Sequence, residues 1–113
     1  MDRAQFYKEV YSIIKEIPYG NVSTYGKIAQ LIGKVYAKGM VGQALSHAPE
    51  EQHLPCHRVV NSQGRLVPGW QKQKELLEKE GITFKPNGCV NMPKHLWDTT
   101  GSLTSTIGIS PTS

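Results

Sequence analysis

The sequence predicts a mainly helical domain with minor β-structure, and three observations support this fold class. Apolar residues recur at helical spacing over residues 3–16, 25–32 and 39–46. The β-branched pair Val59-Val60 and two short runs at 82–84 and 89–92 are typical of strands. The chain has 113 residues, of which 38% are hydrophobic and 19% charged, so we expect one globular domain with a modest core.

The first predicted helix spans residues 3–16. Asp2 and Gln5 have the spacing of a capping box at its start. The apolar side chains on its buried stripe are Phe6, Val10, Ile13 and Ile14, with Tyr7 and Tyr11 on the flanks.

Two short helices follow, joined by a turn that contains glycine. Ser23 or Thr24 is a suitable N-cap for the first, and Gly33 is well placed to end it. The apolar face of the second comprises Met40, Val41, Ala44 and Leu45. This is the outline of a helix-turn-helix, although any small helical hairpin shows the same pattern. The other face carries small or polar residues, which suit the close approach of a DNA duplex and of another helix equally: Gly39, Gly42, Gln43 and Ser46.

The C-terminal third predicts one more helix over residues 70–80, ended by Gly81. Its inward side chains are Trp70, Gln73, Leu76 and Leu77. Segments 82–84 and 89–92 predict a small hairpin that turns at Asn87-Gly88. Residues 94–97 are expected to cap the core. The predicted domain therefore covers residues 1–97, and the Ser/Thr/Gly-rich segment 98–113 is expected to be a disordered tail.

The charge of the chain favours a polyanionic partner only weakly. The formal net charge is +4 and the pI is about 9.1, but many basic proteins bind no nucleic acid. The N-terminus has no signal-peptide core and no apolar run approaches membrane-spanning length, so we expect an intracellular protein, cytoplasmic or, in a eukaryote, nuclear. Two cysteines are few for a disulfide scaffold.

Residues 54–60 are the stretch with the clearest chemical potential, because Cys56 stands directly beside His57. A nearby His⁺ or Arg lowers a thiol pKa, and a histidine can accept the thiol proton during nucleophilic attack. Pro55 restricts the backbone just before the thiol. The plainer interpretation is a half-buried cysteine next to a solvated histidine.

A metal site is a further alternative for this region. Zinc could be bound by members of the set His47, His53, Cys56, His57, Cys89 and His95. We favour no metal, since adjacent Cys56 and His57 would be an awkward pair of ligands. Cys89 is expected to be a small buried hydrophobic residue.

Three motifs stand in order along the chain: Ile17-Pro18-Tyr19-Gly20-Asn21-Val22-Ser23-Thr24-Tyr25-Gly26, Val41-Gly42-Gln43-Ala44-Leu45 and Pro55-Cys56-His57-Arg58-Val59. In these motifs the chain resembles the O6-alkylguanine-DNA alkyltransferases and their relatives, the alkyltransferase-like proteins. The resemblance covers roughly residues 6–97. It implies a winged helix-turn-helix fold whose second helix lies in the DNA minor groove.

The resemblance also implies a reaction and its participants. The alkyl group would pass from guanine O6 of a flipped-out nucleotide to Cys56 in a single turnover, with His57 and Glu80 as the other catalytic residues. Glu80 would hold His57, and Tyr25 would rotate the target phosphate. The expected protein is a monomer without metal, organic cofactor or membrane association. Its expected partner is double-stranded DNA containing O6-alkylguanine, with nucleotide excision repair proteins as possible further partners.

Two sets of binding residues follow from the same resemblance. The expected DNA-binding residues are Thr24, Tyr25, Lys38, Gly39, Gly42, Gln43, Ser46 and Arg58. The expected residues of the substrate pocket are Tyr25, Pro55, Val59, Arg65, Pro68, Gly69 and Trp70.

The sequence departs from the alkyltransferases in ways that keep other functions open. The family places an intercalating arginine at the position of Gly39, and Lys38 is a doubtful substitute because neighbouring helical residues point about 100° apart. The loop at residues 65–70 is shorter than the segment that forms a wall of the base pocket in the alkyltransferases. Alkyltransferase-like proteins share the small size but have tryptophan in place of the cysteine. A lesion sensor that recruits excision repair is therefore the alternative, and a helix-turn-helix regulator is a weaker one.

Overall fold

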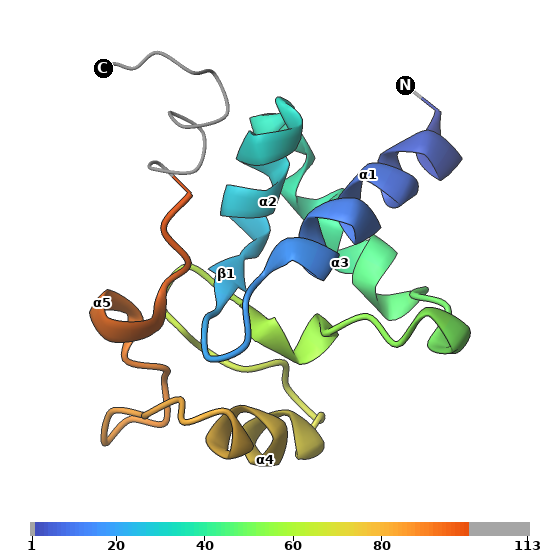
Figure 1. The fold of residues 1–113 in the computed structure, drawn as a ribbon. Coiled ribbons are helices and arrows are strands. Elements are labelled where there is room, and N and C mark those ends of the chain that lie inside the picture. Colours follow the sequence, from blue (N-terminus) through green and yellow to red (C-terminus); the bar gives the residue numbers. More distant parts are fainter. Residues whose placement is uncertain (1, 100–113) are drawn as a thin grey trace.

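The computed structural model describes residues 2–99 and is mostly helical (Figure 1). The elements in chain order are α1 (Arg3–Glu16), β1 (Ser23–Thr24), α2 (Tyr25–Ile32), the 3₁₀ helix η1 (Val35–Ala37), α3 (Lys38–Ser46), η2 (Glu50–Gln52), η3 (Cys56–Arg58), β2 (Val59–Val60), α4 (Lys72–Lys79) and α5 (Met92–His95). This confirms the predicted fold class. Within the described residues, every helix is too short or too polar to cross a membrane.

Helix α1 has the predicted bounds but a different buried face. The Asp2 carboxylate accepts from the Ala4 N–H at 3.2 Å, as an N-cap does. The Gln5 amide donates to Glu9, so the expected capping box is only half formed. Tyr11 is buried rather than flanking, and its hydroxyl donates to the Ala44 carbonyl at 2.8 Å. This bond ties α1 to α3.

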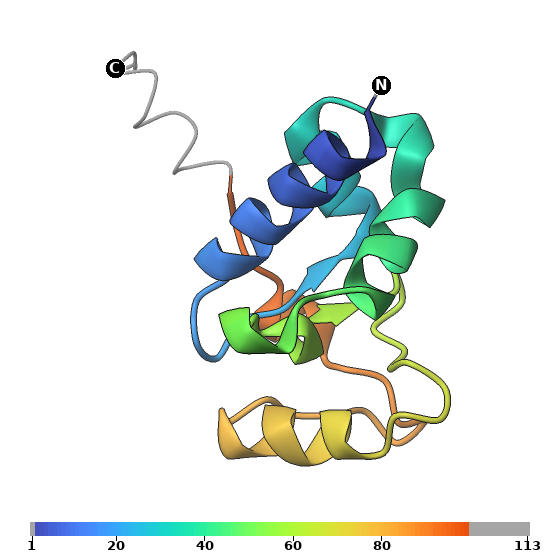
Figure 2. The same ribbon diagram turned by 90° about the vertical axis from the view of Figure 1, so that its right-hand side faces the viewer.

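Helices α2 and α3 form the predicted helix-turn-helix, and α1 packs against both (Figure 2). Thr24, not Ser23, is the N-cap of α2, and its hydroxyl accepts from the Lys27 N–H at 3.0 Å. Gly33 ends α2 at φ 90°, a left-handed conformation that favours glycine. Val41 of α3 is fully buried against α1 and α2.

A two-stranded parallel sheet joins the two halves of the core. The expected strand β2 pairs with β1, which the sequence analysis did not predict, in the register Ser23–Val59 and Thr24–Val60. Successive strand residues point to opposite faces. Val59 accordingly packs in the helical cluster around Phe6, and Val60 packs in a second cluster with Leu77. The segment after Cys56 is therefore held from both sides.

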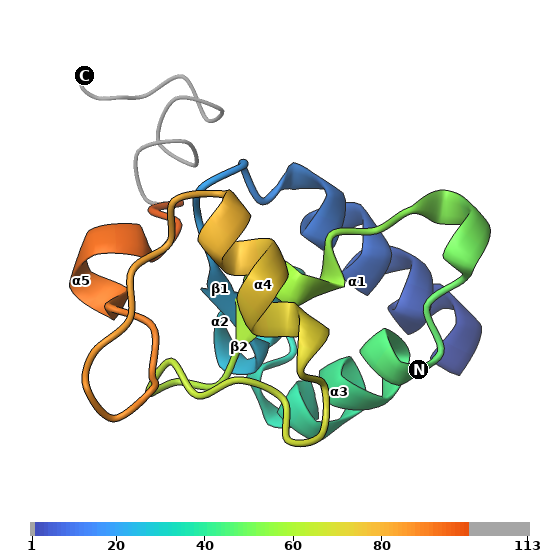
Figure 3. The same ribbon diagram turned by 90° about the horizontal axis from the view of Figure 1, so that it is seen from below.

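The C-terminal elements differ from the prediction in detail. Helix α4 begins at Lys72 and packs against η3. Figure 3 shows α4 from below. Trp70, which was predicted to lie in this helix, lies before it. The predicted hairpin is reduced to one antiparallel bridge between Phe84 and Val90. Gly81 follows α4 at φ 85°, as expected.

The described chain continues past residue 97, the predicted end of the domain. The Trp97 N–H donates to the Val22 carbonyl at 2.7 Å, and Thr99 is buried. The remainder of the predicted tail, 100–113, lies outside the described residues.

Candidate functional site

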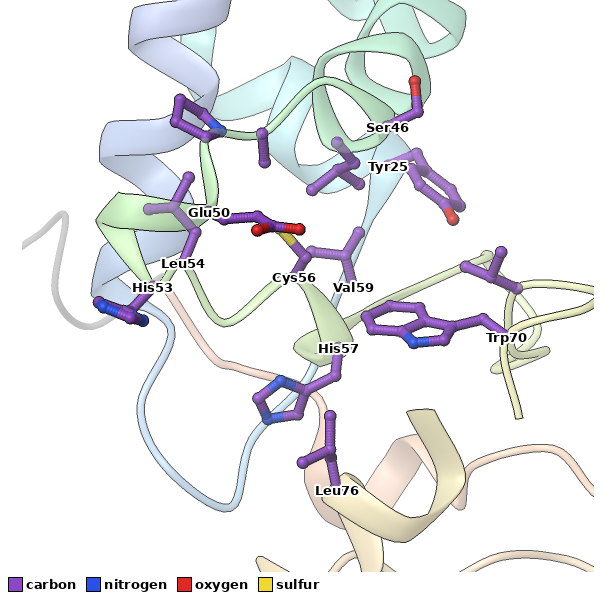
Figure 4. A pocket seen from close by; sticks show the side chains of 15 residues that line it. Tyr25, Ser46, Glu50, His53, Leu54, Cys56, His57, Val59, Trp70 and Leu76 are labelled. Carbon is purple, nitrogen blue, oxygen red and sulfur yellow. The ribbon is translucent and has the colours of Figure 1, made fainter. Parts of the chain in front are cut away.

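Cys56 lies in the wall of a pocket of about 490 Å³. It opens η3 directly after Pro55 and is half-buried. Figure 4 shows the Cys56 side chain between Tyr25 and Trp70 on one side and Glu50 and Leu54 on the other. The thiol is therefore presented to a cavity and not sealed in apolar packing.

Five segments supply the pocket walls. The residues that line the pocket are Tyr25 of α2, Gly42, Leu45 and Ser46 of α3, the loop residues Ala48, Pro49, Glu50, His53 and Leu54, the reactive stretch Cys56, His57 and Val59, and Val67, Trp70 and Leu76. His53 ends η2 at φ 51°, an uncommon conformation for a residue other than glycine. It turns the loop back toward the reactive stretch.

The predicted pocket residues fall into two groups by their position relative to the cavity. Tyr25, Val59 and Trp70 line the cavity. The other four predicted residues lie outside it: Pro55, Arg65, Pro68 and Gly69. Gly69 turns the chain at φ 84°, and this turn brings Trp70 and Val67, not Arg65, to the wall. The loop over residues 48–54 was missed, because a polar loop offers no periodicity from which burial could be inferred.

His57 is held by Glu80, as the resemblance implied. The Nε2 of His57 lies 2.6 Å from Oε2 of Glu80, which follows the last turn of α4. A neutral imidazole that donates from Nε2 keeps its lone pair on Nδ1. His57 is thereby prepared to accept a proton at Nδ1.

Glu80 is an ionised carboxylate with several donors around it. Burial raises its pKa, but hydrogen bonds from Arg58, the Gly20 N–H and His57, together with the Arg58 charge, outweigh burial and lower the pKa below its usual value. The Gly20 N–H donates to Oε1 at 2.9 Å. Glu80 thus stays charged at neutral pH and keeps the histidine oriented.

The Arg58 side chain binds Glu80 and does not line the pocket. Its Nε donates to both carboxylate oxygens of Glu80 at 3.0 Å, and its Nη1 donates to the Ile17 carbonyl at 2.9 Å. The guanidinium also lies 5.6 Å from the centre of the Tyr19 ring. A contact between Arg58 and DNA, as predicted from the sequence, would have to compete with these bonds.

The thiol of Cys56 is not activated by its neighbours in this arrangement. Burial raises the pKa of Cys56, and a hydrogen bond at its own backbone offsets this only in part. His57 and Arg58 do not lower the pKa of Cys56, because both side chains are turned toward Glu80. The thiol is protonated at neutral pH and needs a base when it reacts.

Gln73 is a positioning residue that sequence reasoning did not identify as part of the site. Its side chain is fully buried. The amide nitrogen donates to the carbonyls of His57 and Val59 at 3.1 Å, and the amide oxygen accepts from the Val67 N–H at 2.7 Å. One side chain thus fixes both the reactive stretch and the opposite pocket wall. The sequence did carry a signal for this role, namely a polar residue on the inward face of the predicted helix.

Five of the eight residues predicted to bind DNA lie on α3, Thr24 and Tyr25 lie at the start of α2, and Arg58 lies in η3. Lys38, Gly39, Gln43 and Ser46 are exposed, whereas Gly42 is half-buried in the pocket wall. Apart from the backbone of α3 itself and the adjacent residues, no atom of the described chain lies within 4 Å of the position that a Cβ would occupy on Gly39 or Gly42. The Thr24 hydroxyl is used as the N-cap, and burial raises the pKa of Tyr25, which therefore keeps its proton at neutral pH.

The described residues offer no metal centre. Among them, no group of three histidine, cysteine, aspartate or glutamate side chains is arranged to hold an ion. Cys56 and Cys89 are both free, and Cys89 is half-buried rather than fully buried as expected.

Comparison with known families shows which family the chain belongs to. The family described as 6-O-methylguanine DNA methyltransferase, DNA binding domain, matches residues 5–82. Alkyltransferase-like protein 1 of Schizosaccharomyces pombe is 41% identical over 102 residues, covering 82% of this chain and 94% of that protein. The DNA base-flipping protein of Escherichia coli is 36% identical, covering 82% of this chain and 74% of its own length.

Solved structures agree with the sequence relatives. The S. pombe alkyltransferase-like protein in complex with damaged DNA containing O6-carboxymethylguanine superposes with a TM-score of 0.77 at 40% identity, over 87% of this chain and 99% of that one. The Mycobacterium tuberculosis alkyltransferase OGT in complex with DNA gives a TM-score of 0.61 at 38% identity, over 66% of this chain and 48% of that one. The chain therefore spans about half the length of this second relative.

Proposed function

Because the chain belongs to the 6-O-methylguanine DNA methyltransferase family, whose members act on alkylated guanine in DNA repair, we propose that it removes alkyl groups from guanine O6 by direct transfer to Cys56. One observation carries the proposal: a free thiol lines a pocket beside a histidine that a charged glutamate orients. A protein that only bound the lesion would have no chemical use for this arrangement.

The pocket suits an extrahelical base. Its volume of about 490 Å³ lies within the range of small-molecule sites, and its walls are mainly apolar with a few polar groups. Trp70 and Tyr25 offer flat surfaces to a purine. Guanine O6 inside a duplex is out of reach of a protein thiol, so the nucleotide must swing out of the helix at a cost of a few kcal/mol.

The transfer is a displacement at the carbon attached to O6. The thiol proton passes to Nδ1 of His57, directly or through a water molecule, and the sulfur forms a bond to the alkyl carbon as the carbon–O6 bond breaks. The base leaves as a guanine anion and takes up a proton from water. His57 later releases its proton to solvent. The product thioether has no easy route back to a thiol, so each chain acts once.

A second candidate function is lesion sensing without transfer. Two observations favour it: burial raises the pKa of Cys56, and the similarity to an alkyltransferase-like protein extends over 94% of that relative. In this case the protein would bind alkylguanine DNA and recruit excision repair proteins.

Intact mass separates the two functions. The protein is incubated with a duplex carrying O6-methylguanine, and peptide mapping locates any added methyl group. Transfer predicts one methyl group per chain on Cys56 in the native protein and in the control Cys89→Ser, and none in Cys56→Ser. Selective binding of the lesion duplex without any gain in mass would overturn transfer and support sensing.

A further inference from the structure

Two consecutive apolar side chains lie exposed at the turn between α2 and α3. Val35 is 66% exposed and Tyr36 is 76% exposed. The other strongly exposed aromatic residue, Tyr19, stacks on Arg58 and donates to the Lys79 carbonyl. Within residues 2–99, the Tyr36 ring has no hydrogen bond or ring contact of this kind. It is a large apolar group without such a partner in the described part of the chain.

The position of Tyr36 relates it to the pocket. Tyr36 lies in η1, directly before Ala37, the N-cap of α3, and Gly39 and Gly42 follow on that helix. Gly42 lines the pocket. Gly39 between them in the sequence carries no side chain, and the space beside it is open. Tyr36 is therefore the large exposed side chain at the N-terminal end of the helix that forms part of the pocket wall.

The charge of the segment around Tyr36 indicates what its ring meets. Residues 17–49 contain three lysines and no aspartate or glutamate, although the whole chain has nine acidic residues. Two of the lysines, Lys34 and Lys38, flank the turn. A segment free of carboxylates that carries an exposed aromatic ring fits a polyanion with stacked bases, which is to say DNA.

A flipped nucleotide leaves a gap in the base stack that something must fill. We propose that Tyr36 fills it: its ring enters between the neighbouring base pairs when the lesion moves into the pocket. This inference rests on the proposed function only in requiring a flipped base, and it holds for transfer and for sensing alike. Apolar side chains inserted between base steps stabilise distorted duplexes in this way.

Lys38 is the less suitable candidate for this task. Its aliphatic stem lies across α2, with Cδ 3.6 Å from the position that a Cβ would take on Gly26. An ammonium group is also strongly hydrated and has no flat face with which to replace a base. Lys38 suits a phosphate contact at the edge of the gap.

The test compares duplex with single-stranded DNA. Dissociation constants are measured for a duplex and for a short single strand, each carrying one O6-methylguanine, with the native protein, Tyr36→Ala, Tyr36→Phe and the matched control Val35→Ala. We expect Tyr36→Ala to weaken duplex binding about tenfold, because base–aromatic stacking is worth about 1–3 kcal/mol. Single-strand binding should change less than about twofold, since there is no gap to fill. Tyr36→Phe and Val35→Ala should bind the duplex like the native protein.

Two results would overturn the inference: unchanged duplex binding by Tyr36→Ala, or an equal loss on both DNAs, which would indicate a general contact. Adding Gly39→Arg to Tyr36→Ala should restore duplex binding if the lost function is filling the gap. The proposed function fails separately if the native protein does not distinguish the lesion duplex from an undamaged one.

Discussion

The two parts of the molecule that would meet a damaged nucleotide are built in opposite ways. Around Cys56, the polar side chains are already paired: Glu80 binds His57 and Arg58, and Gln73 holds the backbone on both sides of the pocket. At the turn before α3, the side chain of Tyr36 stands in solvent and Gly39 offers none. The chemical side is thus organised before DNA arrives, whereas the duplex-facing side gains its contacts only on binding. Changes that remove a side chain at the first should therefore alter folding and chemistry, and the loss of the Tyr36 ring at the second should alter the affinity for DNA.

The largest effect is expected from Glu80→Gln. The change removes the charge that pairs with Arg58, whose side chain is only 15% exposed, and it removes the strong acceptor for His57. We expect a loss of about 3 kcal/mol in the free energy of unfolding. Methyl transfer should slow on the order of a hundredfold. Urea denaturation and single-turnover kinetics measure the two effects.

The matched control for this change is Glu78→Gln, which alters an exposed carboxylate on the same helix. It should change the free energy of unfolding by less than about 0.5 kcal/mol. Equal effects of the two substitutions would contradict the claim that the pairing of Glu80 with His57 and Arg58 stabilises the site.

Low pH should lower the free energy of unfolding through protonation of the Glu80 carboxylate. The pKa of Glu80 is lower in the folded chain than its ordinary value of 4.5. Its contribution to stability is therefore fully present above about pH 4.5 and is lost as the pH falls through the folded pKa. Urea midpoints measured from pH 7 to pH 3 should fall more steeply for the native chain than for Glu80→Gln. Parallel curves would show that Glu80 is not the group responsible.

Gly39→Arg tests whether the DNA-facing region sets the affinity for the lesion duplex. The site is open, so an arginine can be accommodated, and its guanidinium can reach the phosphates or the vacated base position. We expect the affinity for an O6-methylguanine duplex to rise about fivefold to tenfold. Gly39→Ala is the control for helix propensity and should raise thermal stability without tightening binding. An arginine variant that binds no better than the alanine variant would contradict this account.

A smaller effect is expected from Glu50→Gln. The Glu50 carboxylate lies in the pocket wall, where it disfavours a negatively charged adduct (Figure 4). Because the side chain is exposed, solvent weakens this repulsion. Binding of an O6-carboxymethylguanine duplex should improve about twofold to threefold, while binding of the O6-methylguanine duplex should not change. Equal changes for the two lesions would exclude a charge effect.

Local signals in the sequence predicted the helices well. Thr24 and Gly33 mark the ends of α2 through the chemistry of their own side chains and backbone, and the reactive stretch is continuous in sequence. These features need no knowledge of distant residues. The contact between His57 and Glu80 was expected only through the family resemblance, and its geometry is now defined.

Features that depend on distant partners were missed. A two-residue strand such as β1 has no periodicity, and it becomes a strand only because β2 pairs with it. Arg58 was expected among the DNA-binding residues through the family resemblance. The Ile17 carbonyl that binds it is 41 residues away in sequence, and no local pattern indicates it.

The central claim is that Cys56 takes the alkyl group from a guanine swung into its pocket, and joint product analysis tests it most directly. Protein and O6-methylguanine duplex are mixed, and the DNA and the protein from one sample are digested and analysed together. Transfer predicts one guanine restored for each S-methylcysteine at position 56, with both amounts rising to one per chain and then stopping. Intact O6-methylguanine recovered from DNA that the protein has saturated, with Cys56 unmodified, would contradict it.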